Sequence, residues 1–434
     1  MDDTRAKKYP VLLNQPMAGY YHTQNPDEDI ELTHTAPGTP CGEYLRRYWH
    51  PVALSEEVKD LPVRIKIMHQ DLVVFRDKRN RVGLLELHCA HRGASLEYGL
   101  ICETGIRCCY HGWQFDIDGS ILEMPTEFGE NSYKNELYQG AFPTREYAGF
   151  IWGYLGPPEK RPPFPRFDIL ETEDFDHEDS VTKTIWPCNW LQIRDNFMDP
   201  LHAIVLHTIS PEGTGFTKAA RVFGEIDFVE TPIGMVYLNA RRMKENIWVR
   251  MAENIFPNMG SFGLNGEDGS REHPFNGPEA TVWSVPMDDT HTINFRMRHF
   301  RSWIPKSEQP PKISFGQQAN RTYEETQRLP GDYEAQVSQR PIAIHALEHP
   351  IKSDRGIMIM RKRLREWINV AKRGEDPPLT TELKDGEIIS TYCNDTVLRV
   401  PEAATEEEDR KLRLEVAHRL IQDYIKEHPS KVTC

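Results

Sequence analysis

The stretch CAHRGASLEYGLICETGIRCCYHGW, residues 89–113, decides how the rest of this sequence is interpreted. It contains the pair Cys89 and His91, one residue apart, and the pair Cys108 and His111, two residues apart. Two cysteines and two histidines in paired spacing indicate a metal site. A structural zinc ion accepts the same four ligands. A two-iron cluster accepts them too, with two cysteines on one iron and two histidines on the other.

The residues around the four ligands favour the two-iron cluster. Gly93 and Gly112 follow the two histidines, where the backbone has to turn tightly and approach the inorganic sulfides. Tyr110 and Trp113 could supply a hydrogen bond and an apolar wall, which are two features that set a cluster's potential. We therefore interpret residues 89–113 as the site of a Rieske [2Fe–2S] cluster.

With this motif the chain resembles the Rieske proteins, and CYHGW (109–113) is very close to the form seen in their oxygenase branch. The respiratory-chain members of the family carry two further cysteines, which form a disulfide between the cluster loops. Those cysteines lie five residues after the first ligand and two after the third. This chain has Ala94 and Tyr110 at these positions, so the respiratory branch does not fit.

The composition is that of a globular protein of two or three domains. The chain has 434 residues, and its formal net charge of −14 argues against a nucleic acid or an anionic membrane as partner. No apolar run approaches the length of a membrane span, and the first residues, MDDTRAKKYP, lack the apolar segment of a signal peptide. Eight cysteines in so long a chain do not suggest a disulfide scaffold. We therefore expect a cytoplasmic protein.

Hydrophobic periodicity divides the chain into four segments. Strand-like runs occur on both sides of the cluster motif, at 63–67, 72–75, 82–87 and 149–156. A proline-rich stretch follows them, and proline is unsuited to regular elements. We expect an N-terminal arm packing on the catalytic domain at 1–42, a Rieske β-domain at 43–156, a linker at 157–167 and a catalytic domain at 168–434.

The second domain is expected to contain an antiparallel sheet with flanking helices, which makes the fold α+β. Its strand-like runs lie at 181–187, 234–242, 247–252, 280–287 and 291–300. Helices are predicted near 190–207 and at 405–427, where Thr405 and Glu408 form a capping box. The segments 260–278 and 305–331 are loops by composition and are the candidates for a gating loop.

A second group of metal-binding residue types lies in the predicted helix near 190–207. Asp199, His202 and His207 form the pattern D-x-x-H-x4-H. Asp199 and His202 share a helix face, but five residues of ideal helix leave the two histidines roughly 140° apart. A shared metal therefore requires a distortion such as a π-bulge or an unwound turn. The alternative is a helix that carries two incidental histidines.

The resemblance to the Rieske oxygenases favours the metal. Their catalytic domain carries the string Asn/Glu-x-x-Asp-x-x-His-x4-His, and Asn196, Asp199, His202 and His207 match it residue by residue. The family implies that both histidines bind a mononuclear non-haem Fe(II). It also implies that Asp199 bridges to a cluster histidine of the neighbouring subunit. A distant carboxylate completes a facial triad that leaves positions open for O2.

The family also suggests the third iron ligand. In the phthalate-dioxygenase-like branch this carboxylate lies nine residues before a Pro-Ile pair. The segment GDYEAQVSQRPI (331–342) gives Asp332. Asp332 could instead be a turn or helix-capping residue after Pro330 and Gly331. Asp354 and Asp395 are the weaker rivals.

The resemblance implies a terminal oxygenase that receives electrons from NAD(P)H through a ferredoxin, a flavin reductase or both. In this family the electron crosses between subunits, so a homotrimer or stacked trimers are expected. Overall similarity favours members that O-demethylate lignin-derived methoxylated aromatic acids of the 5,5′-dehydrodivanillate type. The alternative is a cis-dihydroxylating dioxygenase of the phthalate type. A Rieske electron-transfer protein is the alternative of a different class, although it would leave over half the chain without a role.

An acidic aromatic substrate calls for a cation in the pocket. Arg241, Arg242 and Arg250 lie on predicted strands of the catalytic domain, and arginine binds carboxylates with two parallel hydrogen bonds. Most arginines on strands face solvent, which is the simpler interpretation of each.

Overall fold

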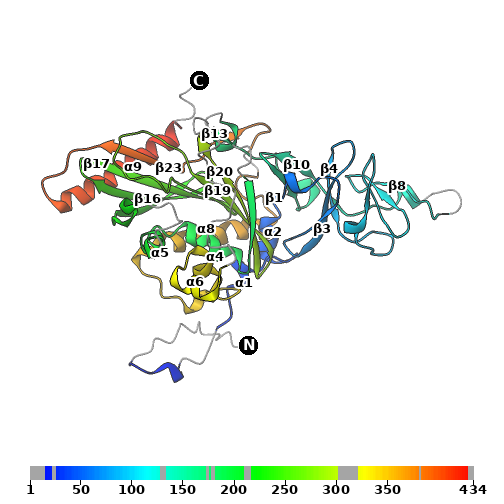
Figure 1. The fold of residues 1–434 in the computed structure, drawn as a ribbon, viewed down its shortest axis with the longest axis horizontal. Helices are drawn as coiled ribbons and strands as arrows, with labels where there is room; N and C mark the ends of the chain where they lie inside the picture. The colour runs from blue at the N-terminus through cyan, green and yellow to red at the C-terminus, as the bar shows by residue number, and fades with distance from the viewer. Residues whose placement is uncertain are drawn as a thin grey trace.

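The computed structural model describes residues 15–21, 26–127, 133–172, 175–176, 181–209, 217–301, 321–380 and 383–428. A small β-rich part and a larger part built on one extended sheet lie at opposite ends of its long axis (Figure 1). Both parts combine antiparallel sheets with separate helices, so the predicted α+β class is confirmed. Among the described residues, no helix combines the length and the apolar character that crossing a membrane would require.

The smaller part contains three antiparallel sheets. Their strands are β1 (Trp49–Leu54), β11 (Phe150–Tyr154) and β10 (Thr144–Tyr147); β2 (Val63–Ile67), β3 (Gln70–Arg76), β4 (Val82–Glu86) and β9 (Ala141–Phe142); and β5 (Leu100–Ile101), β6 (Ile106–Arg107), β7 (Gln114–Phe115) and β8 (Ile121–Glu123). The predicted strands at 63–67, 72–75, 82–87 and 149–156 are therefore present.

Strand β3 explains how this part holds two loops in place. Its apolar run is buried on both faces, and alternate side chains enter two different cores. Leu72 and Val74 join the main core of the molecule. Val73 and Phe75 join a smaller core that also contains Cys89 and Cys108. The apolar run of β3 thus connects the core around the loops of the first motif to the main core of the protein.

The larger part is organised on an eight-stranded antiparallel sheet. Its strands are, in spatial order, β14 (Val181–Trp186), β20 (His291–Arg298), β19 (Ala280–Asp288), β18 (Met259–Phe262), β17 (Asn246–Ile255), β16 (Gly234–Met243) and β15 (Glu225–Thr231), with β23 (Asn394–Arg399) also paired to β17. The predicted strands of the catalytic domain match β14, β16, β17, β19 and β20.

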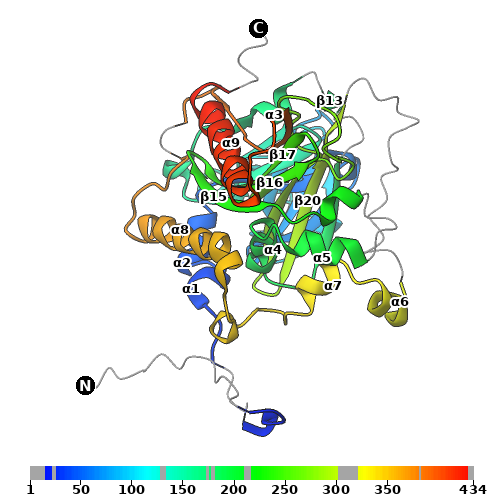
Figure 2. The ribbon, with the colours of Figure 1, turned by 90° about the vertical axis from the view of Figure 1, so that its left-hand side faces the viewer.

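Helices cover the two faces of this sheet (Figures 1 and 2). Helix α9 (Glu406–Lys426) covers one face, where the Tyr424 hydroxyl and the Thr396 hydroxyl of β23 lie 2.9 Å apart. Helices α1 (Ile30–Thr33), α2 (Pro40–Leu45), α4 (Trp190–Phe197) and α8 (Arg355–Lys372) lie on the other side. Arg194 of α4 donates to Asn254 of β17 there. We call the two sides the α9 face and the α4 face.

The described part of the expected N-terminal arm packs against the larger part. The Leu32 carbonyl accepts a hydrogen bond from Trp190 Nε1 at 3.1 Å, and Glu31 pairs with Arg365 of α8 at 2.7 Å. The boundary expected at residue 42 falls inside α2, because the Thr39 side chain caps a helix that runs across it. Residues 1–14 and 22–25 lie outside the described part.

Three other expectations need correction. The predicted loop 260–278 begins inside strand β18, whose edges are hydrogen-bonded to β17 and β19. The predicted loop 305–331 contains helix α6 (Tyr323–Arg328), which has its own capping box, while 302–320 lies outside the described residues. The proline-rich linker ends in strand β12 (Arg166–Phe167), which pairs in parallel with β22 (Ile388–Ile389). The prolines of the linker come before these two residues and therefore do not prevent the pairing.

Candidate metal centres

Two loops with the same backbone pattern carry the first motif. In each loop the cysteine carbonyl accepts a hydrogen bond from a glycine amide four residues later. The distance from Gly93 N to Cys89 O is 2.8 Å, and that from Gly112 N to Cys108 O is 3.1 Å. Both glycines have a φ of 75°, in the left-handed region that favours glycine. The glycines expected to shape the loops therefore do so through matching tight turns.

The four side chains form an inner and an outer pair. Cys89 and Cys108 are 3% and 2% exposed. His91 and His111 are partly exposed, and their ring centroids lie 4.6 Å apart with the planes at 75°. Trp113 stacks on the His91 ring at 4.6 Å with the planes 7° apart, so it forms the expected apolar wall. The sulfur ligands thus face the protein, while the imidazoles face outward.

This arrangement fits a two-iron cluster better than a single zinc ion. Among the described residues, one group has three or more His, Cys, Asp or Glu donors within 4.8 Å of one another. It does not include the four side chains of the first motif. A tetrahedral zinc site would bring all four donors within about 4 Å of each other. Burial raises the pKa of the Cys89 thiol to about 11, so its thiolate needs a bound metal at neutral pH.

The second motif lies where a helix is interrupted. The single helix predicted near 190–207 is two helices, α4 and α5 (His202–Ile209), separated by residues 198–201. Pro200 lacks an amide hydrogen and cannot continue the helical bonding of α4. The carboxylate of Asp199 accepts bonds from Leu201 N at 2.9 Å and His202 N at 3.3 Å, which starts the new helix. The interruption is thus an unwound turn, one of the two distortions that the histidine spacing required.

Three donors from two helices meet at this break. His202, His207 and Asp332 offer ligand atoms that all lie within 4.8 Å of one another. The Nε2 atoms of His202 and His207 each lie 3.5 Å from a different oxygen of Asp332. Asp332 is the first residue of α7 (Asp332–Val337). Ligands of an iron ion at about 2.1 Å and right angles would lie about 3 Å apart, so these residues fit a facial triad.

Neighbouring groups hold the ligands in a metal-binding state. The Nδ1 atom of His202 lies 2.5 Å from the Asp199 carbonyl oxygen, which leaves Nε2 directed at Asp332. Asn196 Nδ2 donates to Asp332 at 3.3 Å. Burial lowers the pKa of His207, which favours the neutral imidazole that binds metals. The Asp199 carboxylate is 29% exposed and lies 3.8 Å from His202 Nδ1, so in this chain its backbone oxygen makes the closer contact.

The rival carboxylates have other partners. Asp354 precedes α8 and accepts a hydrogen bond from Ile351 N at 2.7 Å. Asp395 of β23 accepts from Trp248 Nε1 at 2.8 Å and Arg250 Nε at 2.9 Å. Neither belongs to the group of donors around His202 and His207.

The three candidate substrate arginines differ in their surroundings. Arg242 points to the α9 face, where Asp409 binds its guanidinium, and the prediction for Arg242 is corrected accordingly. Arg250 lies on the α4 face but is paired with Asp395. Arg241 also lies on the α4 face, and its Nε donates to the Val222 carbonyl at 3.0 Å. Arg241 is therefore the remaining candidate for a substrate cation.

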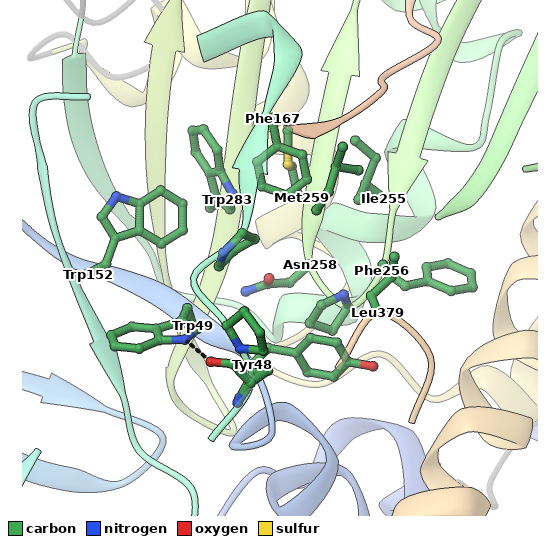
Figure 3. Close-up of a pocket in the computed structure, with 15 residues that line it drawn as sticks. Tyr48, Trp49, Trp152, Phe167, Ile255, Phe256, Asn258, Met259, Trp283 and Leu379 are labelled. Atoms are coloured by element: carbon green, nitrogen blue, oxygen red, sulfur yellow. Dashed lines mark hydrogen bonds between the residues drawn. The ribbon is translucent and has the colours of Figure 1, made fainter. Parts of the chain in front are cut away.

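An apolar cavity of about 40 Å3 lies away from these centres (Figure 3). It is bounded by Trp49 and Trp152 of the smaller part, by linker prolines, and by Met259 and Trp283 of the large sheet. The register of the strands puts the side chains of Met259 and Trp283 on one face of the sheet. The side chain of Asn254, which contacts α4, lies on the other face. The cavity thus belongs to the junction between the two parts and is separated from the metal-binding helices by the sheet.

One supporting network was not predicted from the sequence. Arg361 of α8 binds both oxygens of Asp195 on α4, at 3.0 and 2.6 Å, and also binds Glu348. This charge network fixes α4 beside the metal ligands. No local signal could have revealed it, because Asp195 and Arg361 are 166 residues apart in sequence.

Comparison with known proteins agrees with a Rieske cluster at the first centre. Residues 48–134 match the model of the Rieske [2Fe-2S] domain. The chain is 40% identical over 420 residues to a tert-butanol monooxygenase / tert-amyl alcohol desaturase oxygenase subunit of Aquincola tertiaricarbonis, which covers 91% of this chain and 87% of that protein.

Two further relatives have aromatic acids in their names. The phenoxybenzoate dioxygenase subunit alpha of Ectopseudomonas oleovorans is 35% identical, covering 86% of this chain and 92% of that protein. The 5,5'-dehydrodivanillate O-demethylase oxygenase subunit of a Sphingobium species is 29% identical, covering 81% and 82%.

The first prediction concerns the cluster loops. Cys108→Ser should abolish the visible absorption of the [2Fe–2S] cluster and its acid-labile sulfide, because a buried thiolate ligand is lost. The neighbouring Cys109 is exposed and is the matched control, so Cys109→Ser should keep the full spectrum. Retention of the cluster in Cys108→Ser would exclude this ligand assignment.

The second prediction concerns the third iron ligand. Asp332→Ala should reduce the iron content from three to two per chain and leave the cluster absorption unchanged. The affinity for the mononuclear iron should fall at least about 100-fold. Loss of a residue that only hydrogen-bonds to a metal ligand costs up to that factor, and loss of the ligand itself should cost no less. Asp354→Ala is the control and should keep three irons. The assignment fails if Asp354→Ala loses the iron and Asp332→Ala does not.

Proposed function

The chain belongs to the Rieske non-haem iron oxygenases, and we propose that, as their terminal oxygenase component, it O-demethylates a methoxylated aromatic acid. The observation that carries this proposal is the convergence of His202, His207 and Asp332. Two imidazoles and one carboxylate are the donor set of non-haem Fe(II) oxygenases. When bound there, the iron supplies the oxidation of a C–H bond by O2, using electrons that arrive through the cluster.

The residues of the chain have separate tasks in this reaction. We assign Cys89, His91, Cys108 and His111 to the cluster, which NAD(P)H reduces through a ferredoxin, a flavin reductase or both. We assign His202, His207 and Asp332 to the iron. Asn196 keeps Asp332 oriented by its hydrogen bond.

O-demethylation consumes O2, two electrons and two protons for each methyl group. One oxygen atom enters a methyl C–H bond and the other leaves as water. The resulting hemiacetal then breaks its bond between the methyl carbon and the ether oxygen. The products are a phenol and formaldehyde.

The shape of the chain supports electron transfer between subunits. The sheet β5–β8, which flanks the second cluster loop, lies at one end of the long axis, whereas α5 lies toward the other end (Figure 1). Apolar side chains are exposed beside both centres: Tyr110 is 59% exposed at the cluster, and Phe223, near the helical turn packed on α5, is 69% exposed. A head-to-tail trimer would cover both surfaces and join a cluster to a neighbour's iron. We propose that Asp199 lies at that contact.

The third prediction tests this route. Cys108→Ser and Asp332→Ala should each be inactive alone, and the two should complement each other when co-expressed in mixed trimers. In every trimer that contains both variants, one of the three head-to-tail contacts joins an intact cluster to an intact iron, so about a third of wild-type turnover is expected. The measurement is O2 uptake by mixed trimers isolated with two different affinity tags. Inactive mixed trimers would mean that electrons stay within one subunit.

The names of the relatives guide the choice of substrate. The dehydrodivanillate O-demethylase subunit supports demethylation, and the phenoxybenzoate dioxygenase subunit supports an aromatic acid. A second candidate is oxidation of a small tertiary alcohol, which the 40% identical tert-butanol monooxygenase subunit favours. The charge of Arg241 favours the acid over the alcohol, because a buried cation gains most from an anionic partner.

The fourth prediction distinguishes these reactions. Protein loaded with iron and cluster, supplied with a ferredoxin, a reductase and NADH, should release one formaldehyde for each para-methoxybenzoate consumed. Benzoate lacks the methyl group and is the matched control, and it should give no formaldehyde. A cis-diol without formaldehyde would assign the protein to the ring dihydroxylases. Oxidation of tert-butanol with no reaction of the acid would favour the second candidate.

A further inference from the structure

Within the described part of the chain, a buried positive charge on the α4 face has no acidic partner. Strands β16 and β17 place Arg241 opposite Trp248 and Asn239 opposite Arg250, and alternation brings all four side chains to this face. Arg241 is 2% exposed and Arg250 is 6% exposed. Two guanidinium groups are thus enclosed side by side in the sheet.

Among the residues that the structure describes, one carboxylate serves these two cations. Asp395 binds Arg250 through Nε at 2.9 Å and Nη2 at 3.3 Å, and it also accepts from Leu264 N. The phenol of Tyr237, the other titratable group beside Arg241, is neutral because burial raises its pKa to about 12. Burial and the charge of Arg250 lower the pKa of Arg241 to about 10, so Arg241 stays charged at neutral pH. One positive charge is left over.

The remaining contacts of Arg241 do not use its whole guanidinium. Its Nε–H donates to the Val222 carbonyl at 3.0 Å, and the group stacks over the Trp248 ring at 4.6 Å. Its Nη1 has no hydrogen-bond partner. A buried charge with free donors is costly unless a counter-ion completes it. The position therefore calls for an anion.

Asn239 supplies a second set of free groups at the same place. This side chain is 0% exposed, and neither its amide nitrogen nor its amide oxygen has a partner. Gly224 packs against it so closely that a Cβ there would lie 2.1 Å from the Asn239 oxygen. Asn239 and Arg241 are two residues apart on one strand, so their donors point to the same side. Together they form a cradle for an oxyanion.

The cradle lies on the side of the sheet that carries the proposed metal ligands. Helix α4, which leads directly to Asp199 and His202, lies on this face, and its Phe197 ring packs over Gly260 of β18. The segment after the helical turn Lys218–Arg221 covers Arg241, and that turn packs against α5. The unpaired cation and the donor triad are thus parts of one layer between sheet and helices.

We propose that Arg241 and Asn239 bind the carboxylate of the substrate and thereby position its far end toward His202, His207 and Asp332. This inference rests on the proposed function, because it defines the acid that is oxidised. A carboxylate would bond to Arg241 Nη1 and Asn239 Nδ2 and would neutralise the extra charge. A neutral analogue would leave that charge unpaired, so the cradle selects acids over amides and alcohols.

The fifth prediction compares Arg241→Met with wild type on a matched pair of substrates. The KM for para-methoxybenzoate should rise roughly 30-fold or more, the usual result of removing one partner of a buried charge pair. The KM for para-methoxybenzamide should stay within a factor of about two. The melting temperature should be unchanged or higher, because an uncompensated buried charge has been removed.

A purely structural role of Arg241 gives a different result. Loss of its bond to the Val222 carbonyl would then lower the melting temperature and raise both KM values equally, which would overturn the inference. Arg242→Met is the matched control on the same strand, since it removes the pair with Asp409 on the other face. This control should lower stability and leave the ratio of the two KM values unchanged.

A binding measurement separates this inference from the proposed reaction. Para-methoxybenzoate should raise the melting temperature of the wild type, and it should have no such effect on Arg241→Met or Asn239→Leu. Stabilisation by the acid without formaldehyde release would refute O-demethylation and support the anion site. Formaldehyde release without any effect of Arg241→Met on acid binding would refute the anion site alone. No stabilisation of the wild type by the acid would also refute it.

Discussion

In the proposed iron site two imidazoles five residues apart have to reach one metal ion, and this requirement accounts for the architecture around them. A continuous helix would direct His202 and His207 to different sides. The chain instead ends α4 at Phe197 and begins α5 at His202, with Pro200 and the capping Asp199 between them. Asp332 then enters from another helix and places one oxygen near each histidine. The rest of the larger part holds these pieces in position.

The sheet serves this requirement by giving its two faces different tasks. Arg241 and Arg242 are adjacent in sequence, yet one points to the layer of the metal ligands and the other to α9. Arg242 is neutralised by Asp409, as expected for a charge that ties a helix to a sheet. Arg241 has no such partner within the described residues. One strand can therefore hold a helix with the side chains of one face and keep an unpaired cation on the other face, because successive side chains alternate.

Residues close together in sequence made much of this protein predictable. The cluster loops follow from the cysteine and histidine spacing and from Gly93 and Gly112, and the long strands follow from alternating apolar residues. Sequence reasoning also required a distortion between the two histidines, and residues 198–201 provide it. Strand β18 was missed because its short run MGSF carries little strand signal and depends on two neighbours for its hydrogen bonds.

The unpredicted parts depend on contacts between distant residues. Asp195 and Arg361 pair across 166 residues, and nothing in either segment indicates the partner. The choice among Arg241, Arg242 and Arg250 likewise depended on which acids lie nearby, and these come from β23 and α9. Asn239 has no sequence signature at all, since an asparagine in a strand is informative only when its amide is enclosed and unpaired.

The two centres differ in how their donors are enclosed, and this difference bears on the proposed electron transfer between subunits. In the cluster loops the cysteines are enclosed and the imidazoles face outward, so in the proposed reaction an electron would leave through His91 or His111. His202 and His207 lie on α5, which Figure 1 shows toward the other end of the molecule from β8. The outward imidazoles therefore match a partner surface better than they match the chain's own iron site. The same exposed edge that would accept a reductant would, in a closed ring, face a neighbour's α5.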